Sequence, residues 1–116
     1  MWDAESIWWQ RVKLNEQIVA PSAKFTGSAV DIASALIQQN ELWKQWIDQA
    51  RPNALEHEFI YRNLKGERFK QPVHLVLMHV FNHGTYHRGQ LVTMLRQAGI
   101  ESIPATDFIL FTRTKK

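Results

Sequence analysis

Two histidines, His83 and His87, stand four residues apart in a stretch with helical periodicity. An α-helix turns about 100° per residue, so the two imidazoles lie one turn apart on the same face. At this spacing each ring can present one nitrogen to a single metal ion, at about 2.0–2.1 Å. The alternative is that each ring makes a hydrogen bond to a neighbouring helix and belongs to the core. Gly84 follows His83 where the His-Glu-x-x-His protease motif has its Glu, so that motif is absent.

The helix that carries the pair is expected over residues 72–99. Pro72 suits its first position, because a fixed φ and a missing N–H cost nothing there. Gly99 suits the left-handed residue that closes the last turn. One sector of the helical wheel, about 40° wide, contains both histidines and two apolar residues: Val76, His83, His87 and Met94. This sector is expected to face the core, where an imidazole without a partner costs several kcal/mol.

Two more long helices are expected upstream. The first spans residues 2 to about 13, and acidic side chains in its first turn suit the helix dipole. After a connection over residues 14–27, Ser28 is expected to cap a second helix. Asp31, three residues later, is expected to complete the capping box. This helix ends near Ala50. Its apolar stripe is predicted at Ala33, Leu36, Ile37, Trp43, Trp46 and Ile47, and its solvent-facing side at Gln38, Gln39, Glu41, Lys44 and Gln45.

Residues 54–71 change to the two-residue period of strands, which predicts a short hairpin with Gly66 in its turn. The face expected to cover the helices is formed by Phe59, Tyr61 and Phe69. The hairpin is either a lid over the site or a structural crossover. The tail beyond the last helix carries four apolar residues, 108–111, and is expected to fold back. Its aromatic side chains would then be buried against helix ends or a partner chain.

The composition is that of one small globular domain. The chain has 116 residues, 45% hydrophobic and 22% charged, which is enough for one domain and too little for two. No apolar run approaches the roughly 20 residues of a membrane helix, and no secretory signal is readable, so we expect a cytoplasmic protein with no membrane partner. The absence of Cys excludes disulfides and thiolate ligands. The net charge is +3 without a stripe of basic and aromatic residues, so no specific nucleic-acid binding is expected.

Three stretches of the chain resemble the DinB-like superfamily. Residues 79–99 and 103–109 read HVFNHGTYHRGQLVTMLRQAG and IPATDFI, and they resemble its last helix and tail. Residues 2–11 read WDAESIWWQR and resemble its second helix, which usually reads His-x-x-x-Ala-Glu-x-x-Trp-x-x-Arg. The resemblance implies a mainly α fold, with three long helices of an up-down-down-up four-helix bundle and a short hairpin or extended crossover before the last helix. It also implies a divalent metal ion (nickel, zinc or iron) on three histidines, two of which match His83 and His87.

One ligand of that pattern is not in the chain. The third histidine of the family lies five residues before the Glu matched by Glu5, which is one position before Met1. The family's first helix, further upstream, is absent as well. We therefore expect residues 1–116 to form a single DinB-like domain, incomplete at its N-terminus. Either the sequence is a fragment or a reading frame started too late, or the bundle is completed by association, in a homodimer.

Five further residues are expected around the histidine pair: Glu5, His79, Asn82, Arg88 and Gln90. Glu5 is either a carboxylate of the pocket or a surface charge of its helix. His79 is a residue of the core or pocket, or a third ligand. Asn82 either holds a neighbouring carbonyl or lies on the surface. The resemblance implies that Arg88 and Gln90 orient the helix and bind a substrate or partner; the alternative is that they only bridge helices.

A three-histidine site with open positions would lower the pKa of a bound water or activate a thiol. The resemblance therefore implies a metal-dependent hydrolase or a thiol S-transferase. Its partner would be a small-molecule substrate or a low-molecular-weight thiol such as bacillithiol or mycothiol. The alternative is a non-catalytic helical bundle that acts through self-association or partner binding.

Overall fold

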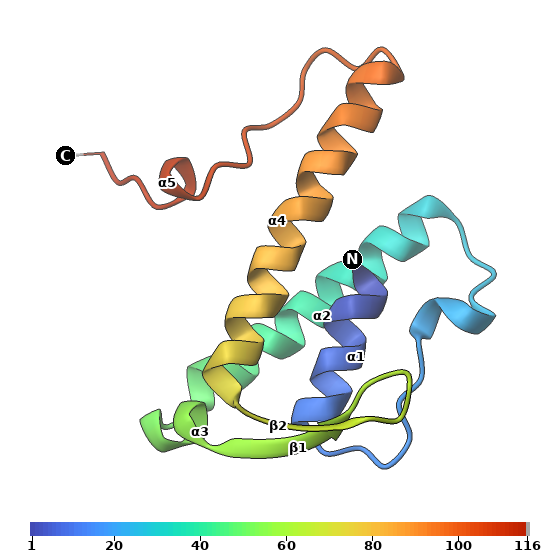
Figure 1. The fold of residues 1–116 in the computed structure, drawn as a ribbon. Helices are drawn as coiled ribbons and strands as arrows, with labels where there is room; N and C mark the ends of the chain where they lie inside the picture. Colours follow the sequence, from blue (N-terminus) through green and yellow to red (C-terminus); the bar gives the residue numbers. More distant parts are fainter. Residues whose placement is uncertain (116) are drawn as a thin grey trace. The chain divides into compact units, whose positions relative to one another are not determined.

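The computed structural model describes residues 1–115 and is mainly α-helical, as expected. The helices are α1 (Trp2–Val12), the 3₁₀ helix η1 (Pro21–Lys24), α2 (Ala29–Gln49), α3 (Pro52–Glu56), α4 (Val73–Gln97) and α5 (Phe108–Phe111) (Figure 1). A single antiparallel hairpin, β1 (Glu58–Arg62) with β2 (Arg68–Pro72), precedes α4. The chain forms two compact units that meet within α4, residues 1–82 and residues from 83 onward. The expectation of a single domain stays a prediction.

The start of α2 has the expected capping box. The backbone N–H of Ser28 donates to Asp31 Oδ2 over 2.8 Å, and the N–H of Asp31 donates to Ser28 Oγ over 3.3 Å. These bonds satisfy N–H groups that have no partner inside the helix. The helix starts at Ala29 and ends at Gln49, close to the predicted bounds.

The end of α1 has a feature that the sequence did not indicate. Leu14 has φ +58°, in the left-handed region that favours glycine. The N–H of Leu14 donates to the carbonyl of Arg11 over 3.0 Å, and the N–H of Asn15 donates to that of Gln10 over 3.0 Å. This is the Schellman pattern of a helix end, with leucine where glycine is usual.

The hairpin and the last helix follow each other without a loop. Gly66 lies in the turn with φ +83°, as expected. Pro72 is not the first residue of the helix, as predicted, but the last residue of β2, opposite Glu58. The helix starts one residue later because the N–H of Val73 still continues the hairpin ladder, donating to the carbonyl of His57 over 3.0 Å. At the other end Gly99, with φ +86°, closes α4 as predicted.

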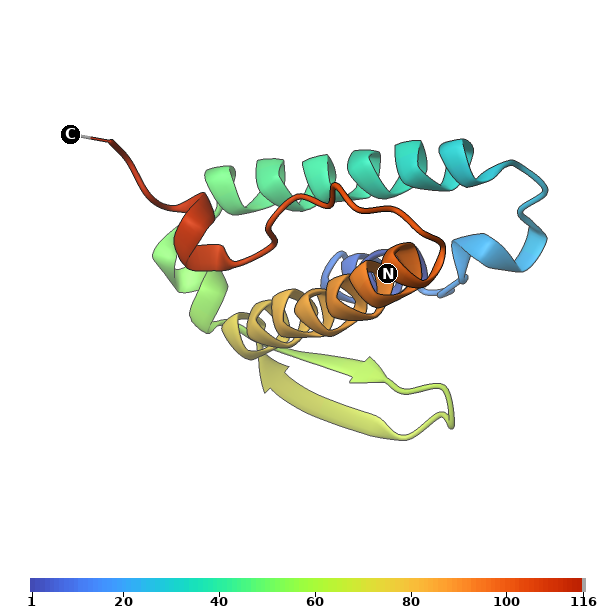
Figure 2. The ribbon, with the colours of Figure 1, turned by 90° about the horizontal axis from the view of Figure 1, so that it is seen from above.

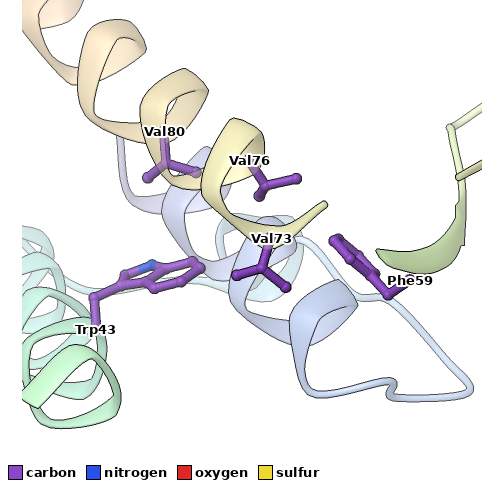
Figure 3. Packing of buried hydrophobic residues seen from close by; sticks show 5 residues of the cluster. All are labelled: Trp43, Phe59, Val73, Val76 and Val80. Atoms are coloured by element: carbon purple, nitrogen blue, oxygen red, sulfur yellow. The ribbon is translucent and has the colours of Figure 1, made fainter. Parts of the chain in front are cut away.

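The core of the first unit is built by three elements. Its buried residues come from α2, from β1 and from the first turns of α4: Trp43, Phe59, Val73, Val76 and Val80 (Figure 3). Fully burying a side chain of this kind contributes about 1.5–3 kcal/mol. Within this unit α1 lies between α2 and the hairpin (Figure 2). The ring of Trp9 packs on Trp43 with centroids 5.3 Å apart, and that of Trp8 packs on Tyr61 at 5.0 Å.

The buried face of α2 differs from the predicted stripe. Ile37 is 66% exposed, whereas Gln39, predicted to face solvent, is only 7% exposed. Gln39 lies one turn before Trp43, and Trp46 lies nearly one turn after it, so all three share a face. The face of α2 that is buried is the one that carries the two indoles. The smaller aliphatic side chains of the predicted stripe do not determine which face is buried. Ile47, also in that stripe, lies at its edge and is 36% exposed.

Two other groups of aromatic side chains are less buried within residues 1–115 than expected. On the hairpin, Phe59 is buried, but Phe69 is 43% exposed because it lies opposite Tyr61, further from the core. In the tail, Phe108 is 77% exposed and Phe111 is 86% exposed. They form the single turn α5, and no apolar surface in the described part of the chain covers them. Burial of this turn against a partner chain stays a prediction.

Within residues 1–115, no helix combines the length and the apolarity that crossing a membrane requires.

Candidate metal centre

His83 and His87 lie on consecutive turns of α4, and their rings meet. Their Nε2 atoms are 2.9 Å apart. The ring centroids are 4.4 Å apart, with an interplanar angle of 86°. Both side chains are half-buried. The two rings therefore present nitrogen atoms to one point in space.

A hydrogen-bonded chain sets the orientation of His87. Its Nδ1 lies 2.9 Å from Gln90 Oε1, and Gln90 Nε2 donates to the hydroxyl of Tyr86 over 3.2 Å. Because the amide oxygen can only accept, Nδ1 carries the proton and donates. In the neutral ring Nε2 is then left with a free lone pair, which faces His83. The short contact between the rings is satisfied when His83 Nε2–H donates to this lone pair.

The arrangement fits a metal ion held by both rings. Two nitrogens bound at about 2.0–2.1 Å to one ion lie about 2.9 Å apart when they subtend a right angle at it, and about 3.4 Å apart at a tetrahedral ion. The observed 2.9 Å matches the right angle. A metal-bound histidine usually donates its other ring N–H to an oxygen, and Gln90 Oε1 accepts from His87 in this way. Among residues 1–115, no group of three or more His, Asp or Glu side chains is arranged to hold an ion.

The face of α4 around the pair is not the buried stripe that the helical wheel predicts. Val76 is buried, but Met94, in the same sector, is 56% exposed. Met94 belongs to the second unit, which consists of the end of α4 and the tail. Within that unit there is no second long helix for this face to pack against.

Gly84 and Arg88 make a close contact beside the pair. Gly84 is buried, and a Cβ there would meet the Nη1 atom of Arg88 at 3.1 Å. Arg88 Nη2 donates to Thr85 Oγ1 over 3.0 Å. The guanidinium is therefore held along α4, over the glycine, and both contacts of Arg88 are to its own helix.

The other three residues expected near the pair lie in the first unit. The ring of His79 packs edge-on against Trp8, with centroids 5.4 Å apart. Glu5 is half-buried between α1 and α2, where the amide of Asn40, with its NH₂ turned toward the carboxylate, donates to both oxygens. Asn82 is exposed. Tyr86 was not predicted as part of the site, although its spacing of four residues from Gln90 places the two side chains on one helix face.

Comparison with known proteins places these features in a family. A family model described as the DinB family matches residues 1–115. Protein DinB of Bacillus subtilis (strain 168) is 54% identical to this chain over 50 residues, a stretch that covers 40% of this chain and 28% of that protein. The chain thus matches well under half the length of this curated relative. No solved structure matches the chain.

Proposed function

This chain belongs to the DinB family, and we propose that it binds a divalent metal ion through His83 and His87. The observation that carries the proposal is the 2.9 Å separation of the two Nε2 atoms, with the far nitrogen of His87 occupied by Gln90. The two Nε2 atoms are close enough for one ion to bind both, once His83 Nε2 has given up the proton that it shares with His87. The hydrogen bond to Gln90 supports the proposal because it leaves the lone pair of His87 on Nε2, the nitrogen that faces His83.

The residues around the pair would have separate tasks. His83 and His87 would supply the ligand atoms, Gln90 would keep the proton on Nδ1 of His87, and Tyr86 would orient the amide of Gln90. Bound there, a divalent ion would supply Lewis-acid chemistry that activates a water or a thiol. We therefore propose a metal-dependent hydrolase or thiol S-transferase, acting on a small molecule or with a low-molecular-weight thiol.

The donor set limits the identity of the ion. Nickel, zinc and iron all accept imidazole nitrogen. The right angle implied by the 2.9 Å separation suits the larger coordination numbers of nickel and iron. Tetrahedral zinc would require the two nitrogens to move apart by a few tenths of an ångström.

Metal content tests the proposal. Purified protein is loaded separately with Ni²⁺, Zn²⁺ and Fe²⁺, dialysed, and analysed by elemental mass spectrometry. We expect about one ion per chain for at least one metal, and its loss in His83→Ala and in His87→Ala. The matched control is His57→Ala, since His57 is exposed and lies outside the pair. Equal metal content in all four proteins, or no bound metal in any, would refute the proposal.

The tail supports a second candidate function, self-association. Four successive residues, 108–111, form one turn, and Phe108 and Phe111 are 77% and 86% exposed. Aromatic side chains grouped in this way are typical of surfaces that a partner covers. We propose a second copy of the chain as that partner.

Light scattering tests this second proposal. We expect a dimer for the wild-type chain and a monomer for the double variant Phe108→Ser/Phe111→Ser. The control is Leu64→Ser, because Leu64 is 89% exposed but stands alone in the hairpin turn. A wild-type monomer at all concentrations would exclude the self-association.

A further inference from the structure

The first unit contains a cavity where α1 ends beside the hairpin. Its volume is about 510 Å³, which lies within the range of small-molecule sites. The lining residues come from the end of α1, the connection that follows it and the two strands. Neighbouring residues Tyr61 and Arg62 both line it, so the cavity reaches around the edge of β1.

Three arginines and one carboxylate line this cavity: Arg11, Arg62, Arg68 and Glu16. The formal charge of the lining is therefore positive. The ion pairs between Lys44 and Asp48 and between Lys70 and Glu58 involve none of these residues, and none of the three guanidiniums has a carboxylate partner within residues 1–115. The remainder of the lining is largely apolar, with Leu14, Ile18 and Ile60.

Arg11 is the most confined of the three. Its guanidinium carbon lies 4.5 Å from the ring centroid of Trp8 and 5.4 Å from that of Tyr61. Its Nε is buried and has no hydrogen-bond acceptor in the described chain. Burial lowers the pKa of Arg11, while the charge of Tyr61 acts in the opposite direction. Because arginine stays charged in proteins, this side chain presents a cation whose Nε–H has lost water and gained no acceptor in return.

Arg62 and Arg68 face each other across the hairpin. They are directly paired in the register of β1 and β2. Like charges opposite each other in an antiparallel pair are destabilising. The guanidinium of Arg62 makes one long hydrogen bond, 3.4 Å, to the carbonyl of Gly66. An anion between the two guanidiniums would remove that cost.

We propose that this cavity binds a small organic anion, with its carboxylate or phosphate group on the arginines and an apolar or aromatic body against Leu14, Ile60 and Tyr61. The planar guanidinium matches both anionic groups with paired hydrogen bonds. A body of modest size fits because the lining also includes apolar side chains. The site is independent of the histidine pair, and its occupancy does not require a metal ion.

Binding of three probes to the metal-free protein tests the proposal. Phenyl phosphate carries a phosphate group and benzoate a carboxylate group, each on a phenyl ring. Phenol has the same ring without the negative charge. At constant ionic strength, NMR titration should show one-to-one saturation by at least one of the anions, with a Kd below about 1 mM. The shifts should be confined to amides of residues 11–18 and 60–68. Phenol should bind at least tenfold more weakly, and the better of the two anions identifies the preferred group.

Two arginine variants and one control complete the test. Arg68→Gln should weaken binding of the better anion at least tenfold, and so should Arg62→Gln. If one of the two variants does not fold, the other still tests the proposal. Lys70→Gln, which removes a positive charge from the same strand outside the cavity, should stay within twofold of wild type. The proposal is wrong if neither anion saturates, if phenol binds as well as they do, or if Lys70→Gln weakens binding as much as Arg68→Gln.

Discussion

His87 is held at both ring nitrogens, by His83 on one side and Gln90 on the other, each over 2.9 Å. The contact with Gln90 decides which nitrogen of His87 carries the proton. The contact with His83 places two Nε2 atoms where one ion could reach both. A single helix, α4, therefore supplies two candidate ligands and the residue that orients one of them.

Gln90 should control metal affinity without being a ligand. Replacing Gln90 by Leu removes the acceptor for His87 Nδ1–H, so the ring is free to change tautomer and to turn. We expect the affinity for the bound metal to fall about 10–100-fold. Competition with a chelating dye measures it. The matched control is Gln97→Leu, at the end of the same helix. An unchanged affinity in Gln90→Leu would show that this hydrogen bond has no role in binding.

Leu14 should be replaceable by glycine with a gain in stability. Leucine at φ +58° is strained, whereas glycine adopts this conformation freely. Since the side chain is 63% exposed, little packing is lost. We expect Leu14→Gly to raise the free energy of unfolding by about 0.5–1 kcal/mol in urea denaturation. Gly99→Ala, at φ +86°, should lower it by a similar amount. A destabilised Leu14→Gly would argue against strain at this position.

Trp43 should be the most sensitive residue of α2. It is 2% exposed, packs on Trp9, and donates from Nε1 to the carbonyl of Glu5 over 3.1 Å. We expect Trp43→Ala to lower the free energy of unfolding by about 3–5 kcal/mol. Ile37→Ala, on the exposed face of the same helix, should change it by less than about 0.5 kcal/mol. Similar losses in both variants would show that the buried face of α2 is assigned wrongly.

Stability should fall in acid partly through Asp31. Its carboxylate accepts hydrogen bonds from the backbone N–H and then from the hydroxyl of Ser28, and these lower the pKa of Asp31. A pKa lower in the folded than in the unfolded chain gives stability that is complete above the unfolded value, near 3.9. It is lost as the pH falls through the folded value. Thermal unfolding between about pH 2 and 6 should therefore show a weaker acid dependence in Asp31→Ala. Parallel curves for the variant and the wild type would contradict this.

Features set by neighbours in the chain could be predicted from the sequence. The Ser28 and Asp31 pair, the turn at Gly66 and the helix end at Gly99 each depend on a few adjacent residues, and the structure has all three. The juxtaposition of His83 and His87 is of the same kind, since it follows from helical spacing alone. Such features need no knowledge of what packs against them.

Features that depend on tertiary packing could not be predicted from the sequence. The buried face of α2 depends on where α1 lies. Gln39 is buried because it shares a face with the indole of Trp43, whereas Ile37 lies on another face and is exposed. The left-handed Leu14 has no signal in its residue type. The cavity with the three arginines joins residues 11 and 68, which no local pattern connects. The hydrogen bond from His87 to Gln90 lies between these cases, because its spacing is helical but its geometry depends on rotamers.

The right-angled donor pair favours nickel over zinc, so anomalous diffraction from crystals grown with Ni²⁺, recorded at the nickel edge, tests the proposed site most directly. The account predicts one strong peak within bonding distance of the Nε2 atoms of both His83 and His87, with Gln90 Oε1 still accepting from His87 Nδ1. It would be contradicted by crystals in which nickel binds elsewhere or not at all and the two rings remain hydrogen-bonded to each other.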